Sequence, residues 1–474
     1  MLNNPLIQRY RYSTLRPKQL WIFVTIYISV VLLIIFLNYS GYKYQTVFED
    51  VTEFNKSLYY QFLTFQVIIL FIWSAYNSGS AIREEILNRS FDFFRMLPLP
   101  AHEKTFGILI GKNLVVLLFA AINLVLLIYF GLAGKISINL QGQVLLILIS
   151  ITIFTNSISL LLSINPAKKR KVSGIVLILF VIFFLIPWVI SAVVMVSSID
   201  ELEHYPVYFF GIEIPILLLN SFIALYLSCW TFKGILRRFT REQEPLFTRK
   251  GAILFLLGYI FVAIGLYYTY IKQEATSIYA FWYTTLLPVL LIPLGSVRGL
   301  DNYIEYSRNF QSKTASGKTS IVSLLMYSNL SLAAGLFAIW AVASIGANFL
   351  ADYADIKPVS ALYNIFILLT GCLFLVLLLE LYVVYKPVSG KIGLLLGFIA
   401  AVYVILPPIL SAIFDNGMIS LYSPAGFMAN LFKEPDLDNS IKTSVWLMNV
   451  MFCVLPALFI WKRYNYILTQ RQKM

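Results

Sequence analysis

The sequence LWIFVTIYISVVLLIIFL, residues 20–37, runs for 18 residues without a charged side chain. An α-helix needs about 20 mainly apolar residues to cross the hydrocarbon core of a bilayer. A helix is the expected conformation because lipid offers no hydrogen-bond partner to exposed backbone groups. No small-residue cleavage site follows this run, so we expect an uncleaved first membrane span rather than a signal peptide.

The composition of the whole chain agrees with this first run. Its 474 residues are 59% hydrophobic and only 12% charged, whereas a soluble domain is about 25% charged. The net charge of +13 is carried by basic residues that lie in short segments between apolar runs. This arrangement is typical of membrane topology and not of nucleic-acid binding. Membrane lipids are therefore the expected surroundings, and no nucleic acid is expected as a partner.

Eleven further apolar runs are long enough to be membrane spans. They cover residues 58–77, 105–132, 143–164, 173–196, 212–232, 252–271, 278–297, 321–350, 360–385, 392–414 and 443–461. The expected fold class is therefore all-α, a polytopic membrane protein with about 12 transmembrane helices.

The basic residues predict the orientation of these spans. With the N-terminus inside, the cytoplasmic segments hold 28 of the 36 Lys and Arg residues and the outer segments hold six. Cytoplasmic loops carry such an excess of basic residues in membrane proteins. We therefore expect a multi-pass protein of the inner or plasma membrane with both termini cytoplasmic, because one missed span would destroy the asymmetry.

The twelve runs form two similar sets of six. The polar stretch TREQEPLFTR, residues 240–249, separates them, and a long cytoplasmic loop follows the second span of each set, at 79–104 and 298–320. Repeated membrane units of this kind are common in transporters. We expect one six-span half in residues 1–240 and another in residues 241–474.

The N-terminal segment NNPLIQRYRYSTLRPKQLW precedes the first span. Leu6, Ile7 and Tyr10 can share one helix face, with basic residues around them, and Pro17 is expected to end that helix. The pattern predicts a short interfacial helix on the inner leaflet. The alternative is a disordered basic tail.

The loop after the second span, IREEILNRSFDFFRMLPLP at residues 82–100, mixes charged and aromatic residues at mainly helical spacing. Aromatic side chains can fill a pocket on a partner protein, and charges can orient the contact. The candidate docking residues are Arg83, Glu84, Glu85, Arg89, Asp92, Phe93, Phe94, Arg95, Leu97 and Pro98. The alternative is an amphipathic loop without a partner.

This loop resembles the signature loop of type-2 ABC exporter permeases. Glu85 matches the first Glu of that signature, Pro98-Leu99 and Gly111-Lys112 match its end, and Arg89-Ser90-Phe91-Asp92 stands where Gly-Thr-Leu-Glu is usual. The opening segment and SPAGFMANLF, residues 423–432, are also similar to such permeases. Arg89 replaces a Gly, however, and the loop of the second half carries no clear copy.

The resemblance implies that residues 83–97 form a coupling helix, which docks in a cleft of a separate ABC ATPase subunit. The chain is then expected to be the exporter's permease subunit, with other membrane subunits as further candidate partners. No cofactor or enzymatic activity of its own is expected. Ser316-Gly317-Lys318-Thr319 is similar to the end of a phosphate-binding loop, but Ser312 stands where that loop needs a Gly.

Few polar residues lie within the predicted spans. Glu380, in the tenth span, is a candidate intramembrane functional acid; alternatively its carboxylate snorkels to the inner boundary or pairs with Lys386. Five asparagines are expected to join helices by hydrogen bonds: Asn123, Asn156, Asn220, Asn329 and Asn364. Cys229, Cys372 and Cys453 are expected to be free, buried thiols without a disulfide, and the two histidines fall on opposite sides of the membrane, which argues against a metal site.

Two other functions stay open at this point. An ion-coupled secondary transporter would need several ionisable residues deep in its spans, and only Glu380 qualifies. A membrane-embedded enzyme for lipid-linked substrates would need a cluster of His, Asp or Glu at one membrane face. No such cluster stands out in the sequence.

The predicted orientation is testable by cysteine labelling. A single cysteine at Asp50 or Asp436 is expected to react with an impermeant thiol reagent in intact cells, because both lie in predicted outer loops. A cysteine at Lys169 is expected to react only after the membrane is opened. Labelling at Lys169 in intact cells would contradict the orientation.

Overall fold

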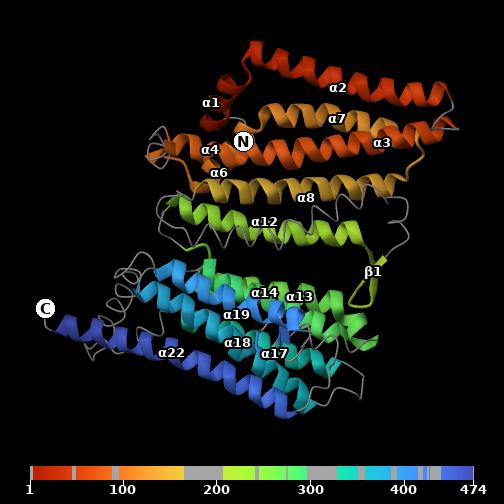
Figure 1. Cartoon of the computed structure of the whole chain (residues 1–474). Coiled ribbons are helices and arrows are strands. Elements are labelled where there is room, and N and C mark those ends of the chain that lie inside the picture. Colours follow the sequence, from red (N-terminus) through yellow and green to blue (C-terminus); the bar gives the residue numbers. More distant parts are fainter. Residues whose placement is uncertain are drawn as a thin grey trace. The chain divides into compact units, whose positions relative to one another are not determined.

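The computed structural model describes residues 4–44, 50–87, 96–164, 206–240, 245–273, 276–295, 328–350, 358–385, 392–414, 420–423, 426–427 and 439–472. Helices make up nearly all of this part of the chain (Figure 1), and its only sheet is a two-stranded hairpin. Nine of the helices within these ranges are long and apolar enough to cross a membrane. The predicted all-α polytopic membrane class is therefore confirmed, while the count of 12 spans stays a prediction.

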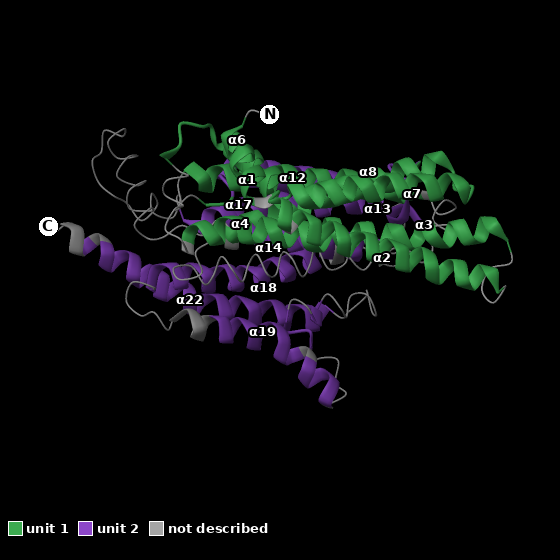
Figure 2. Ribbon diagram, turned by 90° about the horizontal axis from the view of Figure 1, so that it is seen from above, with its two compact units in different colours: residues 1–207, 213–246 green, residues 208–212, 247–474 purple. Residues whose placement is uncertain are grey.

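The chain forms two compact units, coloured separately in Figure 2. Unit 1 contains Met1–Val207 and Glu213–Leu246, and unit 2 contains Tyr208–Ile212 and Phe247–Met474. The sequence-based division was placed between residues 240 and 241. That each unit is one six-span permease half stays a prediction.

Unit 1 is a bundle of long helices. Its helical elements are α1 (Pro5–Thr14), α2 (Pro17–Lys43), α3 (Val51–Val67), the π-helix η1 (Ile68–Trp73), α4 (Ser74–Leu87), α6 (Ala101–Lys112), α7 (Leu114–Ala133), α8 (Ile138–Ser163) and α12 (Ile216–Thr240). Pro17 is the first residue of α2, a position where the missing N–H costs nothing. It therefore begins the first span, whereas α1 has already ended at Thr14.

Three predicted boundaries in unit 1 were wrong. The helix that contains the second predicted span does not end at residue 77 but continues to Leu87, with Ala81 and Ile82 buried. The third predicted span, 105–132, is divided at Asn113 into α6 and α7. The sixth begins in strand β2 (Ile212–Pro215), which pairs with β1 (Pro206–Phe209). The predicted fifth span, 173–196, lies outside the described residues.

The hairpin turn explains the late start of α12. Phe210 and Gly211 both have positive φ, 51° and 82°, which is the geometry of a two-residue hairpin turn. Pro215 closes β2, and the residue before a proline disfavours helical geometry. The helix therefore begins at Ile216 and not at residue 212.

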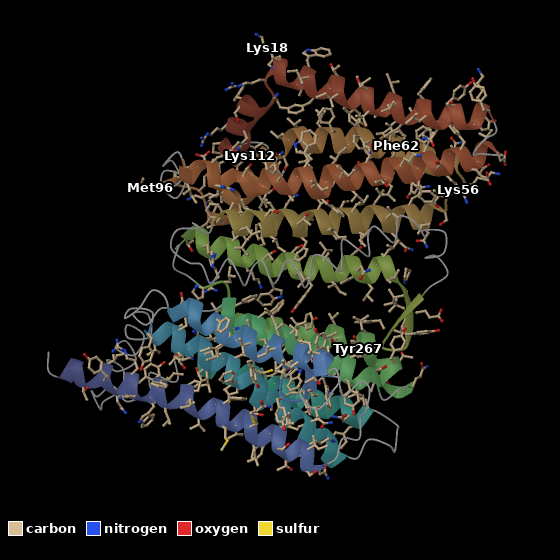
Figure 3. All side chains as sticks on the ribbon, viewed as in Figure 1. Lys18, Lys56, Phe62, Met96, Lys112 and Tyr267 are labelled. Carbon is tan, nitrogen blue, oxygen red and sulfur yellow. The ribbon has the colours of Figure 1, made fainter. Side chains whose placement is uncertain are left out.

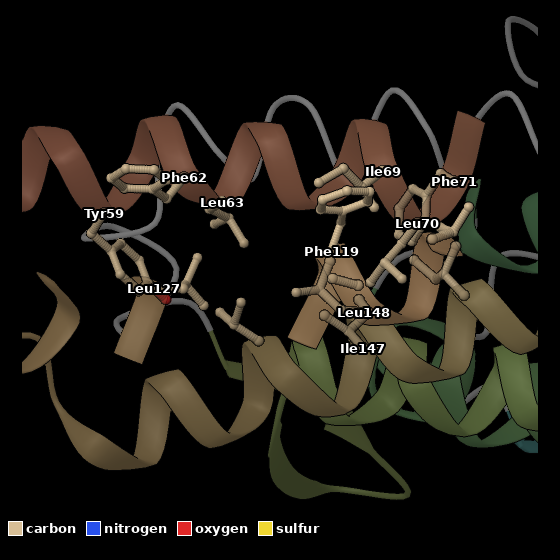
Figure 4. Packing of buried hydrophobic residues seen from close by; sticks show 14 of the residues in the cluster. Tyr59, Phe62, Leu63, Ile69, Leu70, Phe71, Phe119, Leu127, Ile147 and Leu148 are labelled. Carbon is tan, nitrogen blue, oxygen red and sulfur yellow. The ribbon is translucent and has the colours of Figure 1, made fainter. Parts of the chain in front are cut away.

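The core of unit 1 lies between α3, η1, α7 and α8. Phe62 is fully buried and stacks on Phe130 with ring centroids 5.3 Å apart. Figure 4 shows this packing for Tyr59, Phe62, Leu63, Ile69, Leu70, Phe71, Phe119, Leu127, Ile147 and Leu148. In lipid such helices associate through close van der Waals contact, since lipid tails are as apolar as the side chains.

Unit 2 contains the remaining long helices. They are α13 (Arg249–Gln273), α14 (Thr276–Gly295), α17 (Asn329–Leu350), α18 (Pro358–Tyr385), α19 (Ile392–Phe414) and α22 (Asn439–Gln472). The apolar helices α14 and α19 lie where the eighth and eleventh spans were predicted. Trp340 of α17 is fully buried and donates its indole N–H to Thr285 Oγ1 of α14 over 3.0 Å.

Candidate functional site

Helix α1 is held against α6 by its apolar face. Leu6, Ile7 and Tyr10 are all buried, and α1 makes its main contacts with α6. Asn4 fixes the start of α1, because its Oδ1 accepts the Leu6 N–H (2.9 Å) while its Nδ2 donates to the Glu103 carbonyl (2.8 Å). The apolar face formed by Leu6, Ile7 and Tyr10 was predicted correctly. It was expected to lie on lipid, but helix α6 covers it.

Two glycines allow this close approach of α1 to α6. A Cβ at Gly107 would lie 2.9 Å from both Asn4 Oδ1 and Leu6 Cβ. A Cβ at Gly111 would lie 2.6 Å from Cδ2 of Tyr10. Side chains at either position would displace α1, so the glycines determine where the N-terminal helix lies.

Two ion pairs connect α4 to its neighbours. Arg9 of α1 lies 3.2 Å from Glu85, and Lys112 of α6 lies 2.5 Å from Glu84. Lys112 also lies over the ring of Tyr10, with Nζ 5.5 Å from its centroid. Burial, and then the negative charge of Glu85, raise the pKa of Tyr10 above its ordinary value. Tyr10 therefore stays a neutral phenol between two cations.

The ion pairs differ in their exposure to solvent. The Glu85 side chain is 11% exposed and its partner Arg9 is 50% exposed, whereas Glu84 is 53% exposed. Exposed ion pairs contribute little to stability, about 0–1 kcal/mol. Lys112 is 18% exposed, so each pair combines one shielded and one half-exposed side chain; the first pair joins α1 to α4 and the second joins α6 to α4.

The predicted docking residues fall on both sides of a gap in the description. Arg83, Glu84 and Glu85 belong to the last turns of α4 and so continue the helix of the second span. The expectation that they begin a separate helix is wrong. Leu97 and Pro98 follow the gap, with Leu97 partly buried and Pro98 exposed. The remaining members lie outside the described residues: Arg89, Asp92, Phe93, Phe94 and Arg95.

This end of unit 1 therefore brings together residues that the sequence did not connect. Met96 and Lys112 lie at the same end of unit 1 (Figure 3). Arg9, Tyr10 and Lys112 were not predicted as part of the site. The sequence signals were the acidic pair Glu84-Glu85, the match of Gly111-Lys112 to the end of the permease signature and the apolar face that contains Tyr10, and none of these identifies which side chains pair with each other.

Buried asparagines join helices within unit 1, as predicted for Asn123 and Asn156. Asn123 of α7 donates to Gln66 Oε1 (2.7 Å) and to the Phe62 carbonyl (3.0 Å) of α3. Asn156 of α8 accepts hydrogen bonds from two serines of α4. Both are thus confirmed as interhelical contacts.

Glu380 is completely buried in α18. The phenol of Tyr464, on α22, donates a hydrogen bond to Glu380 Oε1. Leu377, Val384 and Ile460 pack around this pair. The alternative in which the carboxylate snorkels to the boundary is wrong, because its side chain has no exposed surface; Lys386 lies outside the described residues.

The close fit of α1 on α6 predicts that Gly111→Ala releases the N-terminal helix. The new methyl group would collide with the Tyr10 ring, and the ring position is fixed by burial. We expect faster cleavage by trypsin after Arg9 and Arg11 in the purified protein, measured by mass spectrometry.

Gly142→Ala is the matched control for this variant. Gly142 is also a helical glycine in unit 1, and a Cβ there would meet nothing within 4 Å. Its cleavage rate is expected to equal that of the natural protein. Equal rates in the Gly111→Ala and Gly142→Ala variants would show that the contact does not hold α1.

The Glu380–Tyr464 pair predicts a difference between two Tyr→Phe variants. Tyr464 donates to a carboxyl group, whereas Tyr403 donates to the neutral Asn449 Oδ1 over 2.7 Å. A hydrogen bond to a charged group contributes about 1.5–3 kcal/mol and a neutral one about 0.5–1.5 kcal/mol. For an ionised Glu380, Tyr464→Phe is therefore expected to lower the thermal unfolding midpoint in detergent more than Tyr403→Phe does. The reverse order would refute a charge-assisted bond.

Chemical groups for metal binding or redox work are sparse in the described part. No three His, Cys, Asp or Glu side chains come close enough there to hold a metal ion. All three cysteines are free, and Cys372 is buried in α18, but Cys229 is exposed, so the expectation that all three thiols are buried is wrong. Comparison with known proteins adds no family: no family model, no curated protein and no solved structure matches this chain.

Proposed function

We propose that this chain is the transmembrane permease subunit of an ABC-type exporter, coupling ATP hydrolysis by a separate ATPase subunit to movement of a substrate across the membrane. One observation carries the proposal. The segment with the export-permease resemblance, residues 85–98, joins two helices that are both fixed to α1 and to each other. Asp92, Phe93 and Phe94 belong to this segment.

Rigid attachment is what a coupling element needs. A segment that receives a push from a partner transmits it only if the helices on either side move with it. Arg9 ties α4 to α1, Lys112 ties α6 to α4, and Gly107 and Gly111 keep α1 on α6. Force applied at residues 88–95 would therefore move α1, α4 and α6 as one body.

The proposed mechanism is switching between two states. Nucleotide binding and hydrolysis in the ATPase subunit favour one arrangement of the permease over another, and the substrate path opens alternately to the two sides. The basic residues near this end of α4 and α6 support a cytoplasmic location in an inner or plasma membrane.

A second candidate, an ion-coupled secondary transporter, is favoured by one observation. Glu380 is a completely buried acid in a spanning helix, hydrogen-bonded to Tyr464. Intramembrane acids commonly belong to ion or proton pathways. It ranks second because a single acid supports it, whereas the docking proposal rests on a motif and on three connected helices.

The proposal predicts the effect of removing two aromatic side chains. If Phe93 and Phe94 are the anchors of the contact, the double substitution to Ala should cost about 2 kcal/mol or more of binding. That cost corresponds to roughly 30-fold weaker association with the ATPase subunit. Co-purification of the ATPase and export should both fall, while the amount of protein in the membrane stays normal.

Phe222→Ala serves as the control, because Phe222 is an exposed phenylalanine of α12, 76% accessible, and is not part of the docking segment. It should leave co-purification unchanged.

Normal co-purification and export in the Phe93/Phe94 variant would remove the docking assignment. Transport that persists without ATP and collapses with an ionophore would favour the secondary transporter, and ATP hydrolysis by the pure chain alone would also contradict the proposal.

A further inference from the structure

Two spans of unit 1 are interrupted inside the bundle. Between α3 and α4 the chain forms η1, where the Ser74 N–H donates to the Ile69 carbonyl five residues earlier. Between α6 and α7, Asn113 leaves helical geometry with φ −97° and ψ 8°. Neither site contains proline, so the surrounding structure maintains both interruptions. Short π-helical turns inside α-helices occur frequently at functional positions.

The packing partners of both spans change at these interruptions. Before η1, α3 packs on α7; after it, α4 packs on α8. Before Asn113, α6 packs on α1 and α12; after it, α7 packs on α3. Most contacts thus divide unit 1 into an α3 group, made of α2, α3 and α7, and an α8 group, made of α1, α4, α6, α8 and α12. The hydrophobic core described above lies at the boundary between them.

In the described part of unit 1, the chain passes between the two groups where the α-helix is broken. The four passages are at Leu15-Arg16, at η1, at Asn113 and at residues 134–137. The last of these includes Lys135, whose φ is 57°. Continuous α-helices resist bending, and sharp bends in helices occur at defects such as π-turns. Each of these four described connections between the groups therefore contains a point that can bend.

A polar knot, defined as Ser74, Ser78, Asn113 and Asn156, joins the two interruptions. The hydroxyls of Ser74 and Ser78 donate to Asn156 Oδ1 over 2.8 and 2.9 Å. Asn113 Nδ2 donates to Ser78 Oγ over 2.8 Å. All four residues are buried. These bonds join α4 to α8 and Asn113 to α4. In apolar surroundings the loss of a hydrogen-bond partner is costly.

The knot also has an unused acceptor. Asn113 Oδ1 is buried and makes no hydrogen bond within the described part of the chain. The side chain thus makes only part of the contacts that its amide group can make. In a second arrangement of the two groups, Asn113 Oδ1 is available to accept a hydrogen bond at the point where the chain bends.

We propose that the α3 group and the α8 group move against each other as two rigid bodies, with the polar knot as the pivot between them. Packed interfaces of this kind switch between discrete arrangements and do not deform continuously. Residues 88–95 join α4 and α6, two members of the α8 group, so a push on that segment would turn the α8 group. That last link rests on the proposed function, whereas the two-body movement does not.

Distance measurements between spin labels test the movement in the purified full-length chain in lipid nanodiscs, without any ATPase. Cys229, Cys372 and Cys453 are first replaced by Ser. One pair, at Val51 and Phe222, spans the two groups. Pairs at Val51 and Leu117, and at Tyr76 and Phe222, stay within the α3 group and the α8 group respectively. All four labelled side chains are exposed.

The spanning pair is expected to give a broad or two-peaked distance distribution, and the two internal pairs narrow ones. Equally narrow distributions for all three pairs would overturn the proposal. A broad distribution within either group would overturn it too, because that group would not be a rigid body. Loss of ATPase co-purification bears only on the proposed function and leaves this measurement unaffected.

Substitution of Asn113 tests the pivot itself. Asn113→Ala removes the bond to Ser78 and should alter the distribution of the spanning pair alone. Asn123→Ala is the matched control: Asn123 is a buried asparagine of α7 whose bonds go to Gln66 and Phe62, both in the α3 group. Its spanning distribution should match that of the natural chain.

Ser78→Ala removes the same hydrogen bond by deleting its acceptor. It replaces Asn113→Ala if that variant folds poorly, as judged by size-exclusion chromatography. The two knot variants should give the same direction of change. If both variants give the same distance distribution for the Val51–Phe222 pair as the Asn123→Ala control, the polar knot is not the pivot.

Discussion

The structure depends on one constraint, which is that polar groups inside a membrane must find partners within the chain. Backbone groups satisfy it by forming helices, and for that reason the described residues contain so little other structure. Polar side chains satisfy it by pairing between helices. Asn38 and Gln61, for example, exchange two amide hydrogen bonds of 2.7 and 2.9 Å and join α2 to α3.

The same constraint governs the charged end of unit 1. Glu85 is 8% exposed as a residue, and its carboxylate is paired with Arg9 across 76 positions of sequence. The N-terminal helix is therefore part of the folded unit, and its cationic side chain belongs to the neighbourhood of the segment proposed to dock an ATPase. A buried acid without such a partner would carry a large desolvation cost.

Polar groups in the two units are used differently. In unit 1 the polar knot lies where helices are interrupted and where packing partners change, so its hydrogen bonds coincide with points of bending. In unit 2 Glu380 and Tyr464 join two long helices, α18 and α22, that pack closely along their length. The first arrangement suits movement between helix groups, and the second suits a fixed pair of helices or an ion-binding role.

The sequence by itself determined the membrane class and the position of most spans, because apolar length and charge distribution are local properties of the chain; it also supplied the segment around Glu85 and Pro98 that is proposed to dock an ATPase. Only the tertiary structure decided where helices break, since η1 and Asn113 carry no proline signal and depend on contacts with distant helices. It also decided that α6 covers the apolar face of α1, that Arg9 and Lys112 are the partners of Glu85 and Glu84, and that Glu380 meets Tyr464. The hydrogen bonds and ion pairs among these contacts join residues 28 to 99 positions apart, and a pattern of neighbouring residues holds no information on which distant side chain will fill the space beside it.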